Sequence, residues 1–346
     1  MDLGLLRGVR SKVLGRLGGA QRLRVGFVGA GQHARTNLYP CLQYLPVELA
    51  AVCTQHLATA ESAATVFGAK AAYADVETMF SKERLDAVLV CVNATEHFRI
   101  ARAALDRGLH VFLEKPATAT LEEAEQLIEL ERKAGRFVMV GFQKRHAPAY
   151  VKARAIAQSP SFGPLSSVSA RLCVGPVSGE DRFLLEVAIH HLDLVRFFAS
   201  EVADVHVETH RSKKGTFTFA LALRFRSGAV GTLHLSTAQS WQANNERLEI
   251  TGEGEFVVVD NMLSLRHYRG AGRGEGPGPF AGAGESFWEP NFTSPTIHNQ
   301  TLHLNGFGFE LEHFVESVRA KRRPKADLED FRQDLLLIQA IRASNR

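Results

Sequence analysis

The sequence predicts an α/β protein of two domains, and three observations lead to this fold class. The chain has 346 residues, which is long for a single hydrophobic core. Across residues 23–143, short apolar runs alternate with longer amphipathic ones, the pattern of a doubly wound parallel sheet with helices on both faces. Across residues 144–346, several runs alternate apolar and polar residues, which indicates an α+β domain with a mainly antiparallel, open sheet.

Ahead of these domains, residues 1–22 form a basic extension. They hold five basic side chains and one acid, and their leucines and valines recur at helical spacing. A segment of this kind can be an organelle transit peptide, a membrane-surface helix, or an extension that packs on a domain or a neighbouring subunit. Because five glycines interrupt its periodicity, we favour the packing extension.

Within the first domain, five short runs are apolar on both faces, as strands buried between two helix layers are. They are LRVGFV (23–28), VELAAVC (47–53), LDAVLVCV (85–92), HVFLE (110–114) and RFVMVGF (136–142). Helical periodicity is found in the runs 57–67, 96–108 and 120–135. The last of these begins with Thr120 and Glu123, at the spacing of a capping box, and ends on Gly135.

The second domain follows a different pattern. One helix is expected over residues 183–200, and two more near 308–321 and 327–344. Strands with one polar face are expected in the runs 203–211, 216–228, 229–238 and 247–260. Residues 270–284 contain seven glycines and two prolines, and we expect a mobile loop there.

Composition argues against several classes of function. The net charge is +4, from 41 basic and 37 acidic residues, and this balance argues against binding to nucleic acid or to a membrane surface. The sequence has no apolar run of about 18 residues, the length that crosses a bilayer. The four cysteines lie far apart and without metal-ligand spacing. We therefore expect buried free thiols, no metal site, and a reducing, cytoplasmic setting.

The stretch LRVGFVGAGQHA combines a strand with a glycine-rich turn. Gly29, Gly31 and Ala34 form the pattern G-x-G-x-x-A directly after the strand and at the start of a helix. The first glycine permits the tight turn, the second lets the backbone approach a pyrophosphate, and the small third residue lets the helix pack against the strand. We therefore expect a dinucleotide, NAD or NADP, to bind here, with Gln32 and His33 of the same turn in contact with it.

The end of the second strand does not decide between the two cofactors. Enzymes specific for NAD usually carry an acid there, which holds the ribose hydroxyls. Here the chain reads Thr54, Gln55 and His56, and Glu48 lies at the opposite end of the strand. No arginine stands there to bind the extra phosphate of NADP either. Thr54 is expected to contact the cofactor in both cases.

Glu114, Lys115 and Pro116 follow a predicted parallel strand, at the end where doubly wound folds place their ligands. The proline restricts the backbone and directs Lys115 towards the ligand. A lysine in this place can hydrogen-bond a carbinol oxygen and exchange its proton. Taken alone, such a Lys-Pro pair at a strand end is more often a solvated turn.

Four stretches together resemble one known family. VGAGQHA, EKPATAT, VGFQKRHAPAY and EVAIHHLDLVRFF occur in the order and spacing of the Gfo/Idh/MocA oxidoreductases, and the resemblance runs from about residue 23 to the C-terminus. It implies a Rossmann domain and a C-terminal α/β domain whose open sheet often forms the interface of a homo-oligomer, here a dimer or a tetramer. It also implies oxidation or reduction of a secondary alcohol or ketone on a sugar, a nucleotide sugar, a cyclitol or a related polyol.

The resemblance assigns roles to individual residues. Lys115 takes the family's catalytic position and contacts both the substrate and the cofactor, with Glu114 also beside the cofactor. Glu186, His190 and Asp193 stand where the family shows D-x-G-x-H-x-x-D. We expect His190 to be the acid/base partner of Lys115 across a crevice, with Glu186 or Asp193 holding it and Glu186 also binding substrate. The alternative is a core histidine and a locally paired Asp193. Because glutamate replaces the usual aspartate, the substrate itself does not carry over.

Four further residues are placed by the same register. Asn93 stands where the family has a threonine beside the nicotinamide ribose, and His97 completes the T-x-x-x-H segment, so the resemblance implies that both contact the cofactor. The alternative for His97 is a histidine at a helix N-terminus without ligand contact. Arg145 is expected to contact the substrate or the cofactor carboxamide, with a surface ion pair as the alternative. His191 is expected to be structural.

Three functions are compatible with these residues. The leading one is an NAD(P)-dependent oxidoreductase acting on CH–OH groups. A second is an NAD-dependent glycosidase, a branch of the same family, which would release free sugar without net turnover of the cofactor. A third is a non-catalytic cofactor-binding protein, which we disfavour because Lys115 and His190 are both present.

Overall fold

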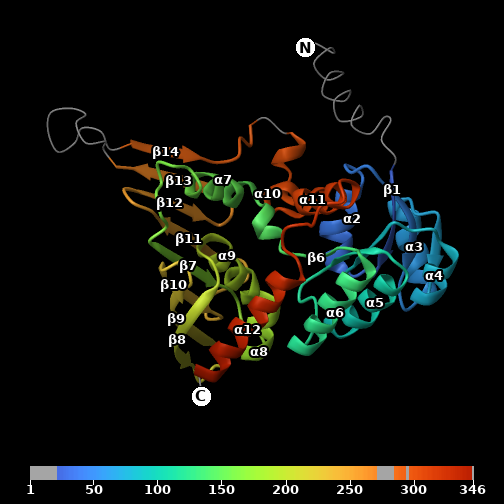
Figure 1. Cartoon of the computed structure of the whole chain (residues 1–346), viewed down its shortest axis with the longest axis horizontal. Coiled ribbons are helices and arrows are strands. Elements are labelled where there is room, and N and C mark those ends of the chain that lie inside the picture. The colour runs from blue at the N-terminus through green and yellow to red at the C-terminus, as the bar shows by residue number, and fades with distance from the viewer. Residues whose placement is uncertain (1–21, 271–283, 294–295, 345–346) are drawn as a thin grey trace, which may run out of the picture. The chain divides into compact units, whose positions relative to one another are not determined.

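The computed structural model describes residues 22–270, 284–293 and 296–344 (Figure 1). Their contacts divide the chain into two compact units. The first contains the described residues up to Gly141 together with Phe307–Arg332, and the second contains those from Phe142 to Gly306 and from Gln333 onward. The sequence predicted one boundary between the two domains, after residue 143, and did not predict that residues 307–332 return to the first unit. Nearly all of the basic extension, and residues 271–283 of the glycine-rich segment, lie outside the described residues.

The first unit is built on a six-stranded parallel sheet. Its strands are β1 (Leu23–Val28), β2 (Val47–Cys53), β3 (Ala71–Tyr73), β4 (Ala87–Val90), β5 (His110–Leu113) and β6 (Val138–Val140). They lie in the order β3-β2-β1-β4-β5-β6, so the chain reverses its direction of winding between β1 and β4. This confirms the predicted doubly wound sheet, whose ligands bind outside the carboxyl ends of the strands at such a reversal. The short β3 was not predicted.

The helices of the first unit also follow the sequence pattern. A π-helical turn, η1 (Ala34–Leu38), runs into α2 (Tyr39–Leu42). It is followed by α3 (Leu57–Phe67), α4 (Val76–Lys82), α5 (Ala94–Asp106), α6 (Leu121–Ala134) and α11 (Phe307–Arg319). The three predicted helices correspond to α3, α5 and α6, and α4 was not predicted.

Both ends of α6 are fixed by the groups that the sequence predicted. The Thr120 hydroxyl accepts a hydrogen bond from the Glu123 amide at 3.2 Å. The Glu123 carboxylate accepts in return from the Ala119 amide at 3.0 Å, which completes a capping box shifted by one residue. At the other end Gly135 has φ +60°, the left-handed conformation that ends helices.

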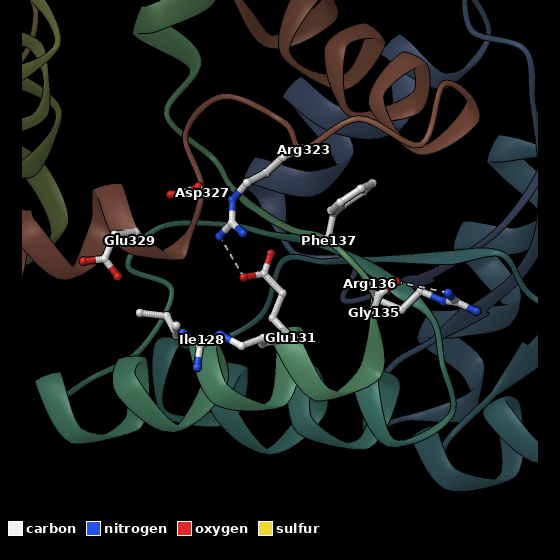
Figure 2. Close-up of a pocket in the computed structure, with 9 residues that line it drawn as sticks. Ile128, Glu131, Gly135, Arg136, Phe137, Arg323, Asp327 and Glu329 are labelled. Carbon is white, nitrogen blue, oxygen red and sulfur yellow. Dashed lines mark hydrogen bonds and ion pairs between the residues drawn. The ribbon is translucent and has the colours of Figure 1, made fainter.

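Residues 307–332 are tied to the first unit beside a hollow of about 560 Å³ between α6 and the chain after α11 (Figure 2). Buried Glu131 of α6 accepts hydrogen bonds from the Val138 amide and from Arg323, each at 3.0 Å. Next to this ion pair, the Val140 amide donates to the Ala326 carbonyl at 2.8 Å. The C-terminal segment thus satisfies part of the free edge of β6, which would otherwise be an unpaired strand edge.

The second unit contains an eight-stranded sheet in the order β14-β13-β12-β11-β7-β10-β9-β8. Its strands are β7 (Ser167–Cys173), β8 (Val202–Arg211), β9 (Phe217–Phe225), β10 (Val230–Ser236), β11 (Asn245–Thr251), β12 (Glu255–Asp260), β13 (Ser264–Arg269) and β14 (Gly284–Trp288). All pairs are antiparallel except β7 with β10. This confirms the predicted, mainly antiparallel sheet, and adds β7, β13 and β14 to the strands that the sequence predicted.

One face of this sheet is covered and the other is exposed. Helices α7 (Pro148–Ala157) and α9 (Ile189–Ala199) pack on the covered face, and α9 continues from a π-helical turn, η3 (Phe183–Ala188). In β9 the side chains alternate, with Phe219 and Leu221 buried and Ala220 and Ala222 exposed. The remaining helices are α8 (Glu180–Arg182), α10 (Thr301–Leu304), α12 (Leu328–Ser344), η2 (Gln143–His146) and η4 (Ile297–Asn299).

Among the described residues, no helix is both long and apolar enough to cross a bilayer.

The turn after β1 provides a test of this architecture. Gly29 has φ +104°, and a Cβ atom placed on it would lie 2.0 Å from the carbonyl oxygen of Cys91. Gly29→Ala is therefore expected to lower the free energy of unfolding by about 1–3 kcal/mol from backbone strain alone, with the steric clash adding to the loss. Urea unfolding measures the change.

Gly31→Ala is the matched control, because a Cβ atom at Gly31 meets no other atom within 4 Å. This variant is expected to unfold at the same urea concentration as the wild-type protein. Equal stability of the two variants would contradict the described turn.

Candidate active site

The glycine-rich turn is fixed on several sides by hydrogen bonds. The Gly29 amide donates to the Cys53 carbonyl at 2.8 Å, which joins the turn to the end of β2. The buried Tyr39 hydroxyl donates to the Gly29 carbonyl, and the Arg35 Nε donates to the Ala30 carbonyl, both at 2.8 Å. The turn therefore presents a preformed backbone, as tight binding of a ligand requires.

A cleft of about 640 Å³ opens beside this turn, at the carboxyl ends of β1, β2 and β4. Its volume lies within the range of about 300–1,000 Å³ that small-molecule and cofactor sites have. Most of the residues predicted to bind the cofactor line it: Gly29, Gly31, Gln32, His33, Ala34, Thr54 and Asn93. The space next to Gly31 is open, as close approach of a ligand to the backbone requires. The residues present thus fit a bound dinucleotide.

At the end of β2 the cleft offers neutral polar groups. Thr54 donates its hydroxyl to the His56 carbonyl at 2.8 Å, and Gln55 and His56 are exposed. One carboxylate, Asp75, also lines this part of the cleft, where it caps α4 by accepting from the Thr78 amide and hydroxyl at 2.7 Å each. These hydrogen bonds lower the pKa of Asp75, and its carboxylate stabilises the N-terminus of α4 as the capping group.

Glu114 lies at the end of β5 and connects this strand to the glycine-rich turn. Its side chain is almost completely buried, and its Oε1 lies 3.1 Å from Nε2 of His33. Its Oε2 accepts a hydrogen bond from the Lys115 amide at 3.0 Å. Gly141 faces the same carboxylate, and a Cβ atom there would lie 3.1 Å from it. Glu114 is therefore held in one position, in contact with a residue that lines the cleft.

His97 supports the turn that carries Lys115. The Lys115–Pro116 peptide bond is cis, and Nδ1 of buried His97 lies 2.8 Å from the Pro116 carbonyl oxygen. A carbonyl only accepts, so Nδ1 carries the proton, and Nε2 accepts from the Val92 amide at 3.4 Å. Burial lowers the pKa of His97, which keeps the ring neutral. Both ring nitrogens are thus bound to backbone groups behind the turn, whereas the sequence suggested contact with the cofactor.

The two predicted acid/base residues of the second unit lie in the segment formed by η3 and α9. Glu186 is half-exposed in η3, and its Oε2 accepts from Nε of Arg182 at 2.8 Å. His190 lies in the first turn of α9, is buried, and packs its ring edge-on against Phe142, with 6.2 Å between the ring centroids.

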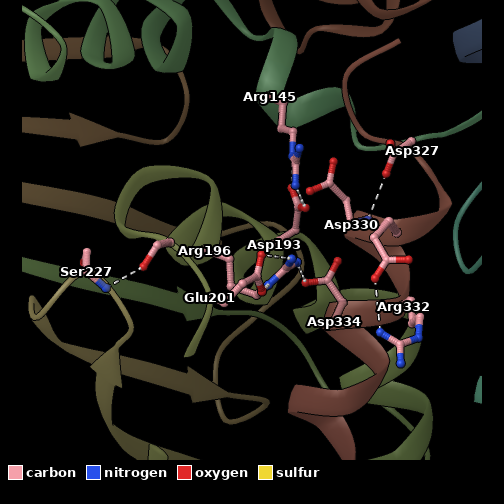
Figure 3. A network of polar contacts seen from close by, with 11 residues as sticks. Arg145, Asp193, Arg196, Glu201, Ser227, Asp327, Asp330, Arg332 and Asp334 are labelled. Atoms are coloured by element: carbon pink, nitrogen blue, oxygen red, sulfur yellow. Dashed lines mark hydrogen bonds and ion pairs between the residues drawn. The ribbon is translucent and has the colours of Figure 1, made fainter. Parts of the chain in front are cut away.

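Asp193 pairs with Arg145 (Figure 3). Nε of Arg145 donates to Oδ2 of Asp193 at 2.7 Å, and a second guanidinium nitrogen donates to Oδ1, so the contact has two hydrogen bonds. Both side chains are buried, and the guanidinium also lies over the ring of Phe197 at 5.0 Å. Of the roles considered for Asp193, local pairing is therefore the one observed. The ion pair of Arg145 is buried, whereas the sequence suggested a surface pair as the alternative to ligand contact.

Arg196 continues this network on the same helix (Figure 3). Its guanidinium donates to Glu201 at 2.7 Å and 2.8 Å, and to Asp334 at 2.5 Å. The negative charges of Asp334, Glu201 and Asp193 raise the pKa of Arg196 despite its burial. Sequence reasoning missed this cluster, because Asp334 is distant in the chain and no local spacing relates the two residues.

A second buried cluster surrounds Glu246 of β11. Its carboxylate pairs with Lys144, accepts from the Tyr150 hydroxyl at 2.5 Å, and lies 3.8 Å from Nε2 of His191. Burial and the charge of Lys144 lower the pKa of His191 to about 3, so this fully buried histidine is neutral. Within the described ranges, no group of three or more His, Cys, Asp or Glu side chains is arranged to hold a metal ion.

Two domain families match the chain, one in each half. Residues 23–142 match the family described as an oxidoreductase family with an NAD-binding Rossmann fold. Residues 150–257 match the GFO/IDH/MocA C-terminal domain. The two matches follow one another along the chain and together take in most of it.

Among curated relatives, the D-apiose dehydrogenase of Paraburkholderia graminis is 26% identical over 348 residues, which cover 94% of this chain and 88% of that protein. The myo-inositol 2-dehydrogenase of Thermotoga maritima is 26% identical over 56% of this chain. A dTDP-3,4-didehydro-2,6-dideoxy-α-D-glucose 3-reductase of Streptomyces antibioticus is 32% identical over 49% of it. The match spans only 62% of the Thermotoga enzyme and 55% of the Streptomyces enzyme.

Solved structures share the fold over nearly the whole chain. A dehydrogenase from Chromobacterium violaceum superposes with a TM-score of 0.84 at 24% identity, covering 94% of this chain and 96% of that one. A levoglucosan dehydrogenase in complex with NADH and L-sorbose gives a TM-score of 0.80 at 19% identity, covering 94% and 97%. At these identities the likeness concerns the fold.

Proposed function

Because the chain belongs to the GFO/IDH/MocA oxidoreductase family, we propose that it is an NAD(P)-dependent oxidoreductase of a secondary alcohol or ketone. We propose a sugar, a nucleotide sugar, a cyclitol or a related polyol as its substrate, since the relatives are named for compounds of these kinds. One observation carries the proposal. The glycine-rich turn and the Glu114–Lys115–Pro116 turn meet at the same edge of the parallel sheet, joined by the contact of Glu114 with His33.

The cleft beside the glycine-rich turn is proposed to hold the cofactor. The backbone at Gly31 would receive the pyrophosphate, with Gln32 and His33 beside it and Ala34 packing the helix against β1. Thr54 and Asn93 would contact the two ribose groups. When bound, the cofactor accepts or supplies the hydride. NAD and NADP are both candidates, because the end of β2 carries neither the usual acid nor an arginine.

Three side chains are proposed to act on the substrate. Lys115 donates a hydrogen bond to the carbinol oxygen and relays its proton. During oxidation the hydroxyl proton passes to the imidazole of His190, which acts as the main base, and in reduction it returns by the same path. Glu186 binds a substrate hydroxyl and assists His190. We assign Arg145, which is engaged by Asp193, to fixing the helix that carries His190.

The exposed face of the second unit's sheet is proposed to be the interface of a homo-oligomer. Small and polar side chains of β7, β9 and β10 form this face, and all are exposed: Ser169, Arg171, Ala220, Ala222, Thr232 and His234. The family resemblance supports this proposal, because the open sheet of such a C-terminal domain often forms the interface of a homo-oligomer. We place the assembly in a reducing compartment such as the cytoplasm, because all four cysteines are free thiols and three are buried.

Gly31→Val tests the cofactor site. A valine side chain would occupy the open space at the turn and exclude the pyrophosphate, while the surrounding protein keeps its contacts. Calorimetric titration with NAD⁺, NADH, NADP⁺ and NADPH is expected to detect binding to the wild-type protein and none to the variant. Unchanged affinity in the variant would remove the cleft from the proposal.

Lys115→Ala and His190→Ala test the proposed chemistry. Each is expected to lose turnover by about 10²–10⁴-fold, the usual cost of removing a positioned acid or base, while the cofactor still binds. A panel of sugars, cyclitols and nucleotide sugars, assayed with both cofactors, identifies the substrate. Near-normal turnover in both variants would refute the assignment. Release of free sugar without net cofactor turnover would favour a glycosidase.

Ala222→Glu tests the oligomer interface. The wild-type protein at micromolar concentration is expected to scatter light as two or four chains of 38.0 kDa. A charge buried within this interface should lower that mass, because Ala222 lies on the exposed face of β9, between β8 and β10. Lys133→Glu, at an exposed site of α6, is the control and should leave the mass unchanged. A monomeric wild-type protein would contradict the interface.

A further inference from the structure

Glu310, on α11, is a carboxyl group enclosed within the first unit. None of its surface is exposed, and neither of its carboxyl oxygens has a hydrogen-bond partner among the described residues. A carboxylate needs donors around it when it is removed from water, whereas a neutral carboxylic acid loses far less on burial. This environment favours the protonated form.

A second buried carboxyl group, Glu114, lies close enough to act on Glu310. Burial is the main cause that raises the pKa of Glu310, the negative charge of Glu114 raises it further, and the charge of Lys115 opposes both. Glu114 receives the Lys115 amide and the His33 ring, whereas Glu310 receives no donor. Two neighbouring buried carboxyl groups cannot both ionise readily, and Glu310, the one without donors, is the group that keeps its proton.

The remaining groups around Glu310 leave this distribution unchanged. Cys41, from α2, is buried nearby, and burial raises the pKa of its thiol to about 12, so it stays a neutral thiol. At the start of α11, Phe307 packs against the His33 ring, with 5.5 Å between the centroids. The titratable and charged groups that face Glu310 are therefore Glu114, Lys115, Cys41 and, through Glu114, His33.

We propose that Glu310 is a positioning residue of the reaction centre, kept as the neutral acid so that one negative charge, that of Glu114, lies beside Lys115. This inference rests on the proposed role of Lys115. A second negative charge there would compete with the carbinol oxygen for the hydrogen-bond donors of Lys115. With one negative charge, the lysine is left to donate to the carbinol oxygen and to relay its proton.

Unfolding measurements test the charge of Glu310 independently of any activity. The native protein keeps the Glu310 proton at pH values where the unfolded chain has released it. Keeping this proton costs more free energy as the pH rises, so the wild-type protein becomes less stable over that pH range. Glu310→Gln has no carboxyl group to titrate at this position and therefore lacks this pH dependence. As the pH rises above the ordinary pKa of a glutamate, about 4.3, the unfolding constant of the wild-type protein should rise relative to that of the variant, by up to about tenfold per pH unit.

Glu316→Gln is the matched control, because it removes a carboxylate from an exposed position of the same helix. Its urea midpoints should follow those of the wild-type protein at every pH. Glu310→Met, which is uncharged and of similar volume, repeats the comparison if the glutamine variant does not fold. Parallel wild-type and variant curves, or wild-type stability that rises with pH relative to both variants, would show that Glu310 is ionised and would overturn the inference.

The pH profile of kcat/KM tests the effect on Lys115. In the wild-type enzyme, ionisation of Glu310 should lower kcat/KM on the alkaline side of the profile. Glu310→Gln should therefore shift this alkaline limb to higher pH, whereas Glu316→Gln should leave it in place. A role in packing alone would not move the limb, and an unmoved limb would refute the inference. Absence of cofactor-dependent turnover would refute the proposed function instead, while the unfolding curves still decide the state of Glu310.

Discussion

At the end of β1 the backbone passes so close to the Cys91 carbonyl that only a glycine fits at position 29. The close approach joins the ends of β1 and β4, and the Gly29 amide joins the same point to β2. Because three strands end together there, the cleft opens at their carboxyl ends, and Glu114 of the neighbouring β5 comes within reach of His33. The arrangement of the first unit's site thus follows from the absence of one side chain.

In the second unit, buried charges fix the elements that carry the proposed site residues. Arg145 with Asp193, Arg196 with Asp334, and Lys144 with Glu246 are all largely withdrawn from water. Such pairs add little net stability over apolar packing, but removing one partner leaves the other charge buried, at a cost of about 3–5 kcal/mol. They therefore restrict how α9 can pack on the sheet, and His190 belongs to that helix.

The sequence was most informative where structure is local. The bounds of β1, β2 and α3 follow from runs of apolar and helix-forming residues, and the capping box and Gly135 set the ends of α6. β3 was missed because its three residues are only half-buried and carry no periodic signal. Most of the residues predicted to bind the cofactor line the cleft, since a turn and the strand ends around it are readable from spacing.

Groups that meet through the tertiary fold were not predictable in this way. Glu310 lies almost two hundred positions from Glu114, and Glu246 about one hundred from Lys144. In the sequence each looks like an ordinary acid on a helix or strand. His97 carried a motif, yet its neighbours Val92 and Pro116 define its part as a support for the lysine turn.

The return of residues 307–332 to the first unit bears on how the protein is made. Synthesis proceeds from the N-terminus, so the strands of the six-stranded sheet emerge from the ribosome long before Arg323 and Ala326 do. Until then the edge of β6 lacks the Ala326 carbonyl, and Glu131 lacks its arginine. The first unit therefore reaches its native form only after residues 307–332 have been synthesised, and until then the edge of β6 remains open to pairing with another chain.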